Sequence, residues 1–352
     1  MQARGQGWLH GLIGDDEIAT EFDDAAQFAS FSRFEAALIS GLAAAGRIEP
    51  GDAARLTDDI AGFRPDTAAI AEAAVRDGVP VPEYVRQLRA HISAPGGEML
   101  HFGATSQDLI DTATVEALIR VGDRFIERLE TLLTALDKVE KRDGHNPLQA
   151  ITRMQPALGF HVADRLAAWC RPLETARDRW LDLRGEIGVL QFGGAVGDLQ
   201  ALGAGAGKVA QTMAAKLELR WPGHAWHTER APLMRAASWF EGVTAALGKI
   251  GQDIALMALR GPSDIELSGG GRSSAMPHKH NPVAGEQLLA LARHNATLMG
   301  GLHQAGIHEM ERSGAAWMLE WTILPQICET TGAALKAAST LVNSINRMGE
   351  TS

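Results

Sequence analysis

Apolar residues recur at alternating spacings of three and four over much of the chain, which is the pattern of amphipathic helices. Three stretches keep this pattern over several turns. The first consists of Leu118, Val121, Phe125, Leu129, Leu132, Leu136 and Val139. The second consists of Leu233, Ala236, Phe240, Val243, Leu247, Ile250, Ile254 and Met257. The third consists of Met154, Leu158, Val162, Leu166, Trp169 and Leu173, with a bend expected at Pro172.

Two further helical stretches begin at about Val283 and Ala315, and no segment alternates between apolar and polar residues as a strand would. Several of the predicted helices have about 25–35 residues, well above the globular mean of about 11–12. Helices of this length need equally long partners. The sequence therefore predicts an all-α fold with a central bundle of five long helices.

The first hundred residues carry shorter helical patterns, which prolines interrupt. These prolines are Pro50, Pro65, Pro80, Pro82 and Pro95. Because proline ends or kinks a helix, we expect a smaller, all-helical N-terminal domain over residues 1–104. Residues 105–352 would then form the central long-helix bundle domain.

Charge and composition narrow the possible partners. The chain has 33 Lys and Arg against 43 Asp and Glu, a net charge of −10, whereas a nucleic-acid partner needs a basic face. No apolar run approaches the roughly 18 residues that span a membrane, and the N-terminus has no signal-peptide core. Cys170 and Cys328 cannot form a disulfide framework. We therefore expect a cytoplasmic protein with neither a nucleic-acid nor a membrane partner.

Residues 261–282 form a glycine-rich segment between two predicted long helices, and a long loop in a bundle is often functional. The segment concentrates Arg272, Ser273, Ser274, His278, Lys279, His280 and Asn281. In the alternative interpretation, Asn281 and Pro282 only start the next helix. Capping needs no neighbouring cations or serines, so we favour a functional loop. His278 and His280 could chelate a metal, but no Cys or carboxylate cluster lies nearby, and we expect no metal site.

Two other segments precede predicted helices. In residues 96–112, Thr105 and Asp108 have the spacing of a variant capping box, and the Thr105 and Ser106 hydroxyls would lie at a helix N-terminus, which favours anions. These two interpretations are compatible. In TRMQP, residues 152–156, Arg153 and Gln155 are expected in the first turn of a long helix. Taken alone, this segment is better explained if Arg153 and Gln155 are simply solvated residues of the first helical turn than if they have a function.

Together and in this order, the three segments resemble the signature regions of the fumarase/aspartase superfamily. SSAMPHKHNP, residues 273–282, is similar to its loop motif SSxMPxKxNP, HFGATSQD to its first region, and TRMQP to its second. Within the superfamily, HFGATSQDLIDT and residues 226–230, WHTER, are most similar to the branch of bacterial 3-carboxy-cis,cis-muconate cycloisomerases. Adenylosuccinate lyases are the next most similar branch.

This resemblance implies a homotetramer with a twenty-helix core, whose active sites each draw residues from three subunits. It implies cyclisation of a small polycarboxylate in aromatic-compound catabolism, with no cofactor and no metal. Ser273 would transfer the proton, activated by Lys279 and backbone amides, and Asn281 would hydrogen-bond a substrate carboxylate. The remaining substrate-binding residues would be His101, Thr105, Ser106, Arg153, Gln155, Ser274, Met276, His278 and Arg312.

Two departures from the superfamily pattern refine this expectation. Arg153 stands where the superfamily's lyases usually carry a histidine, which weakens the alternative of a fumarate-releasing, adenylosuccinate lyase-like enzyme. The chain also ends near the last predicted bundle helix, so we expect the C-terminal third domain of most relatives to be absent. Reuse of the scaffold as a non-catalytic structural protein is a further alternative. The intact Ser273, Lys279 and Asn281 count against it.

Overall fold

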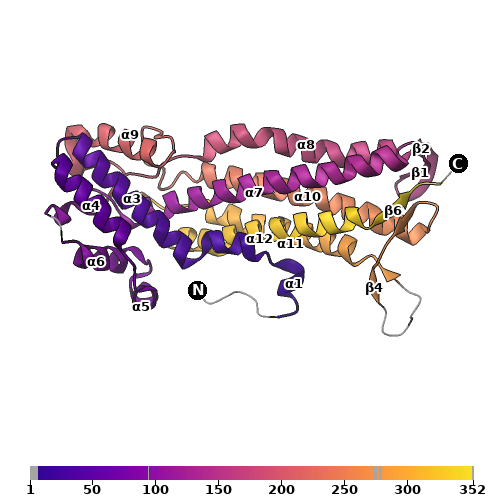
Figure 1. Ribbon diagram of the computed structural model, residues 1–352, viewed down its shortest axis with the longest axis horizontal. Helices are drawn as coiled ribbons and strands as arrows, with labels where there is room; N and C mark the ends of the chain where they lie inside the picture. The colour runs from indigo at the N-terminus through magenta and orange to yellow at the C-terminus, as the bar shows by residue number, and fades with distance from the viewer. Residues whose placement is uncertain (1–6, 94, 273–275, 277–279, 351–352) are drawn as a thin grey trace.

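The fold is known from a computed structural model, which describes residues 7–93, 95–272, 276 and 280–350. Long helices run along the long axis of an elongated molecule (Figure 1). Five of them form the bundle: α7 (Ser106–Asp143), α8 (Val162–Ile187), α10 (Ala231–Arg260), α11 (Val283–Ala305) and α12 (Ala315–Asn343). The predicted all-α bundle of five long helices is therefore confirmed.

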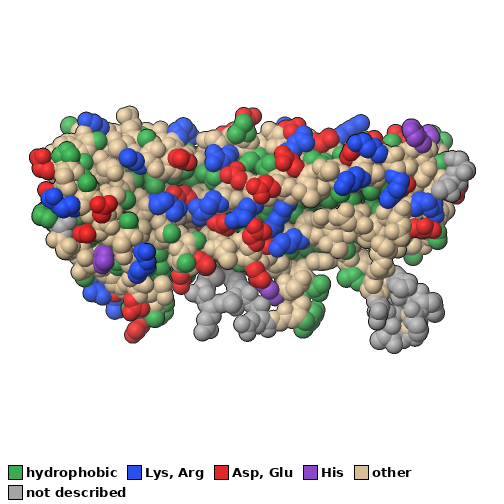
Figure 2. All heavy atoms as spheres, in the orientation of Figure 1, with side chains coloured by type: hydrophobic (Ala, Val, Ile, Leu, Met, Phe, Trp, Pro, Cys, Tyr) green, Lys and Arg blue, Asp and Glu red, His purple; other side chains and the backbone are tan. Residues whose placement is uncertain are grey.

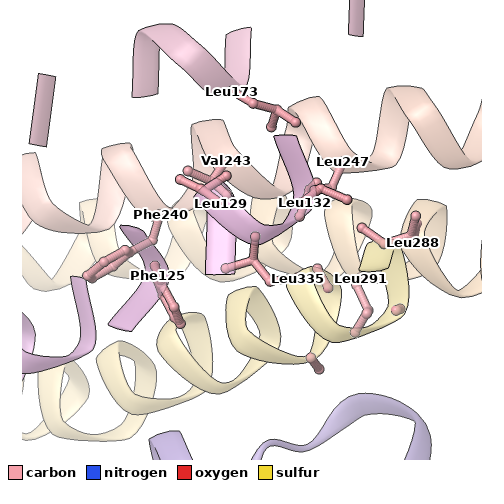
Figure 3. Packing of buried hydrophobic residues seen from close by; sticks show 14 of the residues in the cluster. Phe125, Leu129, Leu132, Leu173, Phe240, Val243, Leu247, Leu288, Leu291 and Leu335 are labelled. Atoms are coloured by element: carbon pink, nitrogen blue, oxygen red, sulfur yellow. The ribbon is translucent and has the colours of Figure 1, made fainter. Parts of the chain in front are cut away.

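The bundle core is built from the apolar faces that the periodicity predicts. Every residue of the α7 and α10 stripes is at most 4% exposed. α7 packs against α8 and α12, and α10 packs against α8, α11 and α12. Figure 3 shows Phe125 of α7 close to Phe240 of α10, with ring centroids 5.4 Å apart at an interplanar angle of 85°. Burial of these stripes supplies most of the bundle's favourable free energy.

Shorter helices gather at one end of the molecule, where α3, α4, α6 and α9 lie together (Figure 1). They build a second hydrophobic core, which also takes in the first turns of α7 and segments after α8. The helices before α7 and between α8 and α10 are α1 (His10–Ile13), α2 (Asp16–Ala19), η1 (Thr20–Phe22), α3 (Asp24–Ala44), α4 (Pro50–Gly62), α5 (Thr67–Asp77), α6 (Val81–His91), η2 (Gly97–Met99), η3 (Gln200–Gly205) and α9 (Ala206–Lys216). The domain boundary at residue 104 stays a prediction.

The expectation of no strands is wrong. β1 (Pro147–Thr152) and β2 (Gln155–His161) form an antiparallel hairpin, so α8 begins at Val162 and not in TRMQP. Met154 and Leu158, assigned to the α8 stripe, are 69% and 80% exposed. Pro156 explains the difference, because proline disfavours the helical conformation of the residue before it. The remaining α8 stripe, from Val162 to Leu173, is buried as predicted.

Two smaller strand pairs lie at the same end of the bundle as this hairpin (Figure 1). β3 (Ile265–Leu267) pairs with β6 (Ile345–Met348), and β4 (Gly271–Arg272) pairs with β5 (His280–Asn281). The alternative interpretation, in which Asn281 caps the following helix, is wrong, because Asn281 belongs to β5 and Pro282 is the N-cap of α11. Within the described residues, no helix is long and apolar enough to cross a bilayer. Acidic and basic side chains are interspersed over the face shown in Figure 2.

Candidate active site

The start of α7 holds four of the predicted site residues. Thr105 is the N-cap, and its backbone N–H donates to the Asp108 carboxylate at 3.0 Å, so the predicted capping box is present. Ser106 is the first residue of α7 and is half-buried. Arg312, from the loop between α11 and α12, donates from Nη1 to the Thr105 hydroxyl at 2.5 Å. A cation therefore lies at a helix N-terminus. The cation and the helix N-terminus together favour an anionic ligand.

His101 lies four residues before this N-cap and is held by a carboxylate from another helix. Its Nδ1 is 2.8 Å from Oε1 of Glu35 on α3, and its backbone N–H donates to Oε2 of the same residue at 2.8 Å. Glu35 is fully buried, whereas the His101 side chain is 17% exposed. The two-point contact fixes the imidazole beside the start of α7.

Asp108 connects the capping box to the protein interior. It is fully buried and accepts from the backbone N–H groups of Gly193 at 3.0 Å and Gly194 at 2.9 Å. Nε2 of the buried His227 lies 2.8 Å from the same carboxylate. Burial raises the pKa of Asp108, although His227 and the backbone donors act in the opposite direction. The geometry makes Asp108 a structural anchor for the α7 N-terminus.

One turn further along α7, Asp111 enters a buried ionic network. Arg230 donates from both terminal nitrogens to the Asp111 carboxylate, at 2.7 and 3.0 Å, and also forms a two-point pair with Glu320, at 2.9 and 2.7 Å. The side chains of all three residues are 1% exposed. Burial is the largest single influence and would raise the pKa of Asp111. The Arg230 charge and the hydrogen bonds from Arg230, Gln191 and Trp317 act against burial and together lower the pKa. This triad joins α7, the start of α10 and α12.

Nε2 of His308, in the loop that also carries Arg312, lies 3.2 Å from Oε1 of Glu320. The His308 side chain is fully buried, and within the described part of the chain its Nδ1 has no hydrogen-bond partner. The network therefore extends from α7 through Arg230 to the loop of Arg312. It links the two segments that meet at the α7 N-terminus.

The second predicted region lies at the tip of the β1–β2 hairpin. Thr152 pairs with Gln155, which leaves Arg153 and Met154 as a two-residue turn with φ of 48° and 64°. Both central residues lie in the left-handed region, as a type I′ turn requires. Arg153 and Gln155 are exposed. Arg153 is therefore exposed at the tip of the hairpin, and the hairpin lies at the end of the bundle opposite α3 and α9 (Figure 1).

The third region, the loop motif, is described only at its base. Gly271 pairs with Asn281, which brings the two ends of the loop together. Asn281 is half-buried and lines a cavity of about 580 Å³ between this base, the start of α11 and the end of α12. Met276 is 42% exposed. Ser273, Ser274, His278 and Lys279 lie outside the described residues.

Within the part of one chain that the structure describes, the predicted site residues do not come together in one place. At 1.5 Å per residue, the 38 residues of α7 span about 57 Å. His101, Thr105, Ser106 and Arg312 lie at its start, whereas Arg153, Gln155 and Asn281 lie toward its far end (Figure 1). A small substrate cannot contact both groups within a single chain. The described residues of the predicted site thus fall into two separate groups, which we call half-sites.

The sequence did not indicate Glu35 or Glu320 as members of the site region. Glu35 belongs to α3, and Glu320 belongs to α12. Each looks like an ordinary polar position within a helix. Asp108, Asp111 and Arg230 do lie in the quoted segments HFGATSQDLIDT and WHTER. Among the described residues, no group of three or more His, Cys, Asp or Glu side chains has the geometry to hold a metal ion.

Comparison with known proteins assigns the family. The family model for lyases matches residues 51–295. The chain belongs to this lyase family. The lyase-family chain is 34% identical over 335 residues to the 3-carboxy-cis,cis-muconate cycloisomerase of Bradyrhizobium diazoefficiens, covering 94% of this chain and 74% of that protein. The enzyme of the same name from Pseudomonas aeruginosa is 34% identical, with 92% of this chain and 72% of that protein covered.

The fold of the lyase-family chain is similar to a solved structure in the same group. The 3-carboxy-cis,cis-muconate lactonizing enzyme from Pseudomonas putida superimposes with a TM-score of 0.88 at 32% sequence identity. The alignment covers 97% of this chain and 77% of that one. The helical fold of the fumarase/aspartase type, inferred from the signature segments, is confirmed by this similarity.

Proposed function

We propose that the lyase-family chain is a cycloisomerase that converts 3-carboxy-cis,cis-muconate to 4-carboxymuconolactone, in the protocatechuate branch of aromatic-compound catabolism. The observation that carries the proposal is the similarity to cycloisomerases of this name over more than nine-tenths of the chain. The free thiols of Cys170 and Cys328 fit the reducing cytoplasm, where we place the enzyme.

The reaction needs one nucleophile, which the substrate itself provides. A carboxylate oxygen of the substrate adds to the conjugated double bond and forms the C–O bond of the lactone ring. The displaced electron pair moves toward the neighbouring carbon, next to a carboxylate, and a proton is delivered there. We assign this proton transfer to Ser273, with Lys279 and the loop amides stabilising the negative charge that develops. No bond to the enzyme and no change in oxidation state are required.

The remaining residues are assigned to hold the carboxylates. The start of α7, with Thr105, Ser106 and the Arg312 guanidinium, offers hydroxyls, helix N–H groups and a cation to one carboxylate. His101 lies beside them. Arg153 and Gln155 at the hairpin tip, with Asn281, Ser274, Met276 and His278 of the loop motif, are assigned to the rest of the substrate. Local cations of this kind would attract a tricarboxylate to a chain of net charge −10.

We infer that the active sites are completed between subunits of a homotetramer. The support is the separation of the two half-sites along α7, which no small substrate can bridge. Apolar side chains at the molecule's surface support association, because Leu181, Leu259, Ile307 and Met318 are each more than half exposed. In a closed symmetric assembly, the hairpin and loop of one chain can meet the α7 N-terminus of another.

A direct assay of the purified protein tests the reaction. With 3-carboxy-cis,cis-muconate, we expect the ultraviolet absorbance of the conjugated diene to fall, and proton NMR to identify 4-carboxymuconolactone as the product. With adenylosuccinate, we expect no fumarate. Fumarate release from adenylosuccinate without turnover of the muconate would establish the competing lyase activity. Lack of turnover of both substrates, with the protein folded, would favour the non-catalytic role.

A further inference from the structure

We propose that Glu35 is a positioning residue that fixes the tautomer and orientation of His101, so that Nε2 of the imidazole is the atom presented to the substrate. The kinetic consequences of this proposal rest on the proposed function. The contact between Glu35 and His101 is present in the structure and does not depend on that function.

The contact is a two-point one between a single carboxylate and a single residue. Oε1 of Glu35 lies 2.8 Å from Nδ1 of His101, and Oε2 accepts from the His101 backbone N–H at 2.8 Å. An ionised carboxylate can only accept hydrogen bonds. With Glu35 as a carboxylate, Nδ1 is the donor of this hydrogen bond and carries a proton, and Nε2 is the ring nitrogen left for a ligand.

The backbone of His101 makes this support necessary. Its φ is 60°, in the left-handed region that residues other than glycine rarely adopt. Such a conformation persists only where surrounding contacts hold it. The bond from the backbone N–H to Glu35 supplies one such contact, and the bond from Nδ1 then sets the direction of the ring.

The two residues differ in their exposure to solvent. Glu35 lies on α3 in the second hydrophobic core and is fully buried, whereas the imidazole remains 17% exposed beside the α7 N-terminus. Glu35 therefore cannot touch a substrate from its buried position, but His101 can. This is the arrangement in which one residue acts through another.

The kinetic test is a double-mutant cycle. Glu35→Gln keeps the size of the side chain but replaces one acceptor oxygen with an N–H₂ donor, which can turn Nδ1 into the acceptor and move the proton to Nε2. We expect kcat to fall by about 10–100-fold, as for loss of similar outer-shell partners. In a His101→Ala background, the same substitution should change kcat little. Glu35→Asp, which keeps the charge, should retain more activity than Glu35→Gln.

Glu116 offers a matched control, because it is a buried glutamate of α7 that pairs with a residue of α3. It pairs with Arg33 at 2.6 Å, and within the described residues its hydrogen-bond partner is Arg33 and not His101. Glu116→Gln should leave kcat within about twofold of the wild-type value, as expected for changes away from the site. Equal losses in Glu35→Gln and Glu116→Gln, or additive losses for Glu35→Gln and His101→Ala, would reduce Glu35 to a structural role.

A second measurement needs no turnover. Diethyl pyrocarbonate acylates an unprotonated imidazole nitrogen, and peptide mass spectrometry locates the modified histidine. In the wild-type protein we expect His101 to react through Nε2, and in Glu35→Gln we expect most of this reaction to be lost. His224, whose side chain is 61% exposed, serves as the internal reference. Unchanged acylation of His101 would overturn the proposal even in an active enzyme, whereas a wild-type protein that does not lactonise the muconate would refute only the proposed function.

Discussion

Replacing Arg230 with alanine is expected to lower the free energy of unfolding by about 3–5 kcal/mol, because it leaves two buried carboxylates without their common cation. Asp111 and Glu320 each make two hydrogen bonds to the guanidinium, and all three side chains are 1% exposed. The cavity left by the side chain adds to the loss. Since the triad joins α7, α10 and α12, the damage should spread to the α7 N-terminus.

Urea unfolding followed by circular dichroism measures this effect. Arg235→Ala is the matched control, because Arg235 belongs to the same helix but forms an exposed pair with Glu186 at 3.5 Å. Exposed pairs contribute about 0–1 kcal/mol, so the control should unfold almost as the wild-type protein does. Similar urea concentrations at the unfolding midpoint for both variants would contradict the assignment of Arg230 as a buried structural cation.

Ser273→Ala is expected to lower kcat by about 10²–10⁴-fold, the usual contribution of a proton-transfer group. The secondary structure should be unchanged, because the substitution removes only one hydroxyl. KM should change much less than kcat if the hydroxyl acts mainly in the transition state. Steady-state kinetics on 3-carboxy-cis,cis-muconate provides both parameters.

Ser268 is a suitable control for this substitution, since it lies between β3 and β4 on the approach to the same loop. Its hydroxyl donates to the Ser344 carbonyl oxygen at 3.1 Å, a structural bond outside the signature motif. Ser268→Ala should turn over at close to the wild-type rate. Near-normal kcat in Ser273→Ala would remove Ser273 from the proton-transfer role and leave another group to supply it.

The long helices could be predicted from sequence because their apolar periodicity persists over many turns. The buried faces of α7 and α10 follow it residue by residue. The prediction failed at Met154 and Leu158, which continue the helical spacing but belong to a hairpin. Only these two residues continued the helical spacing before α8, which is too few to assign a helix. Pro156 decided the local conformation instead.

The site could be predicted only in part, because motifs indicate residue types and not their partners. Thr105 and Asp108 are three residues apart, so their capping interaction was readable from the sequence. Glu35 and His101 are 66 residues apart, and Arg230 and Asp111 are 119 residues apart. Such contacts arise from the packing of α3 and α10 against the start of α7, which no local pattern specifies.

Whether two half-sites from different chains complete one active site can be measured by mixing two inactive variants. Ser273→Ala alters the loop motif, whose base of Gly271 and Asn281 lies toward the far end of α7, and His101→Ala alters the half-site at the start of α7. Each variant alone should have little activity. If the two residues of a site come from different subunits, random assembly of equal amounts should leave about a quarter of the sites unsubstituted.

The decisive experiment is therefore coexpression, or unfolding and reassembly, of the two variants, followed by the muconate assay. Recovery to about a quarter of the wild-type rate is the predicted result for sites shared between chains. The same treatment of each variant alone is the control and should restore nothing. No recovery in mixed oligomers, confirmed as mixed by native mass spectrometry of differently tagged chains, would contradict the shared site.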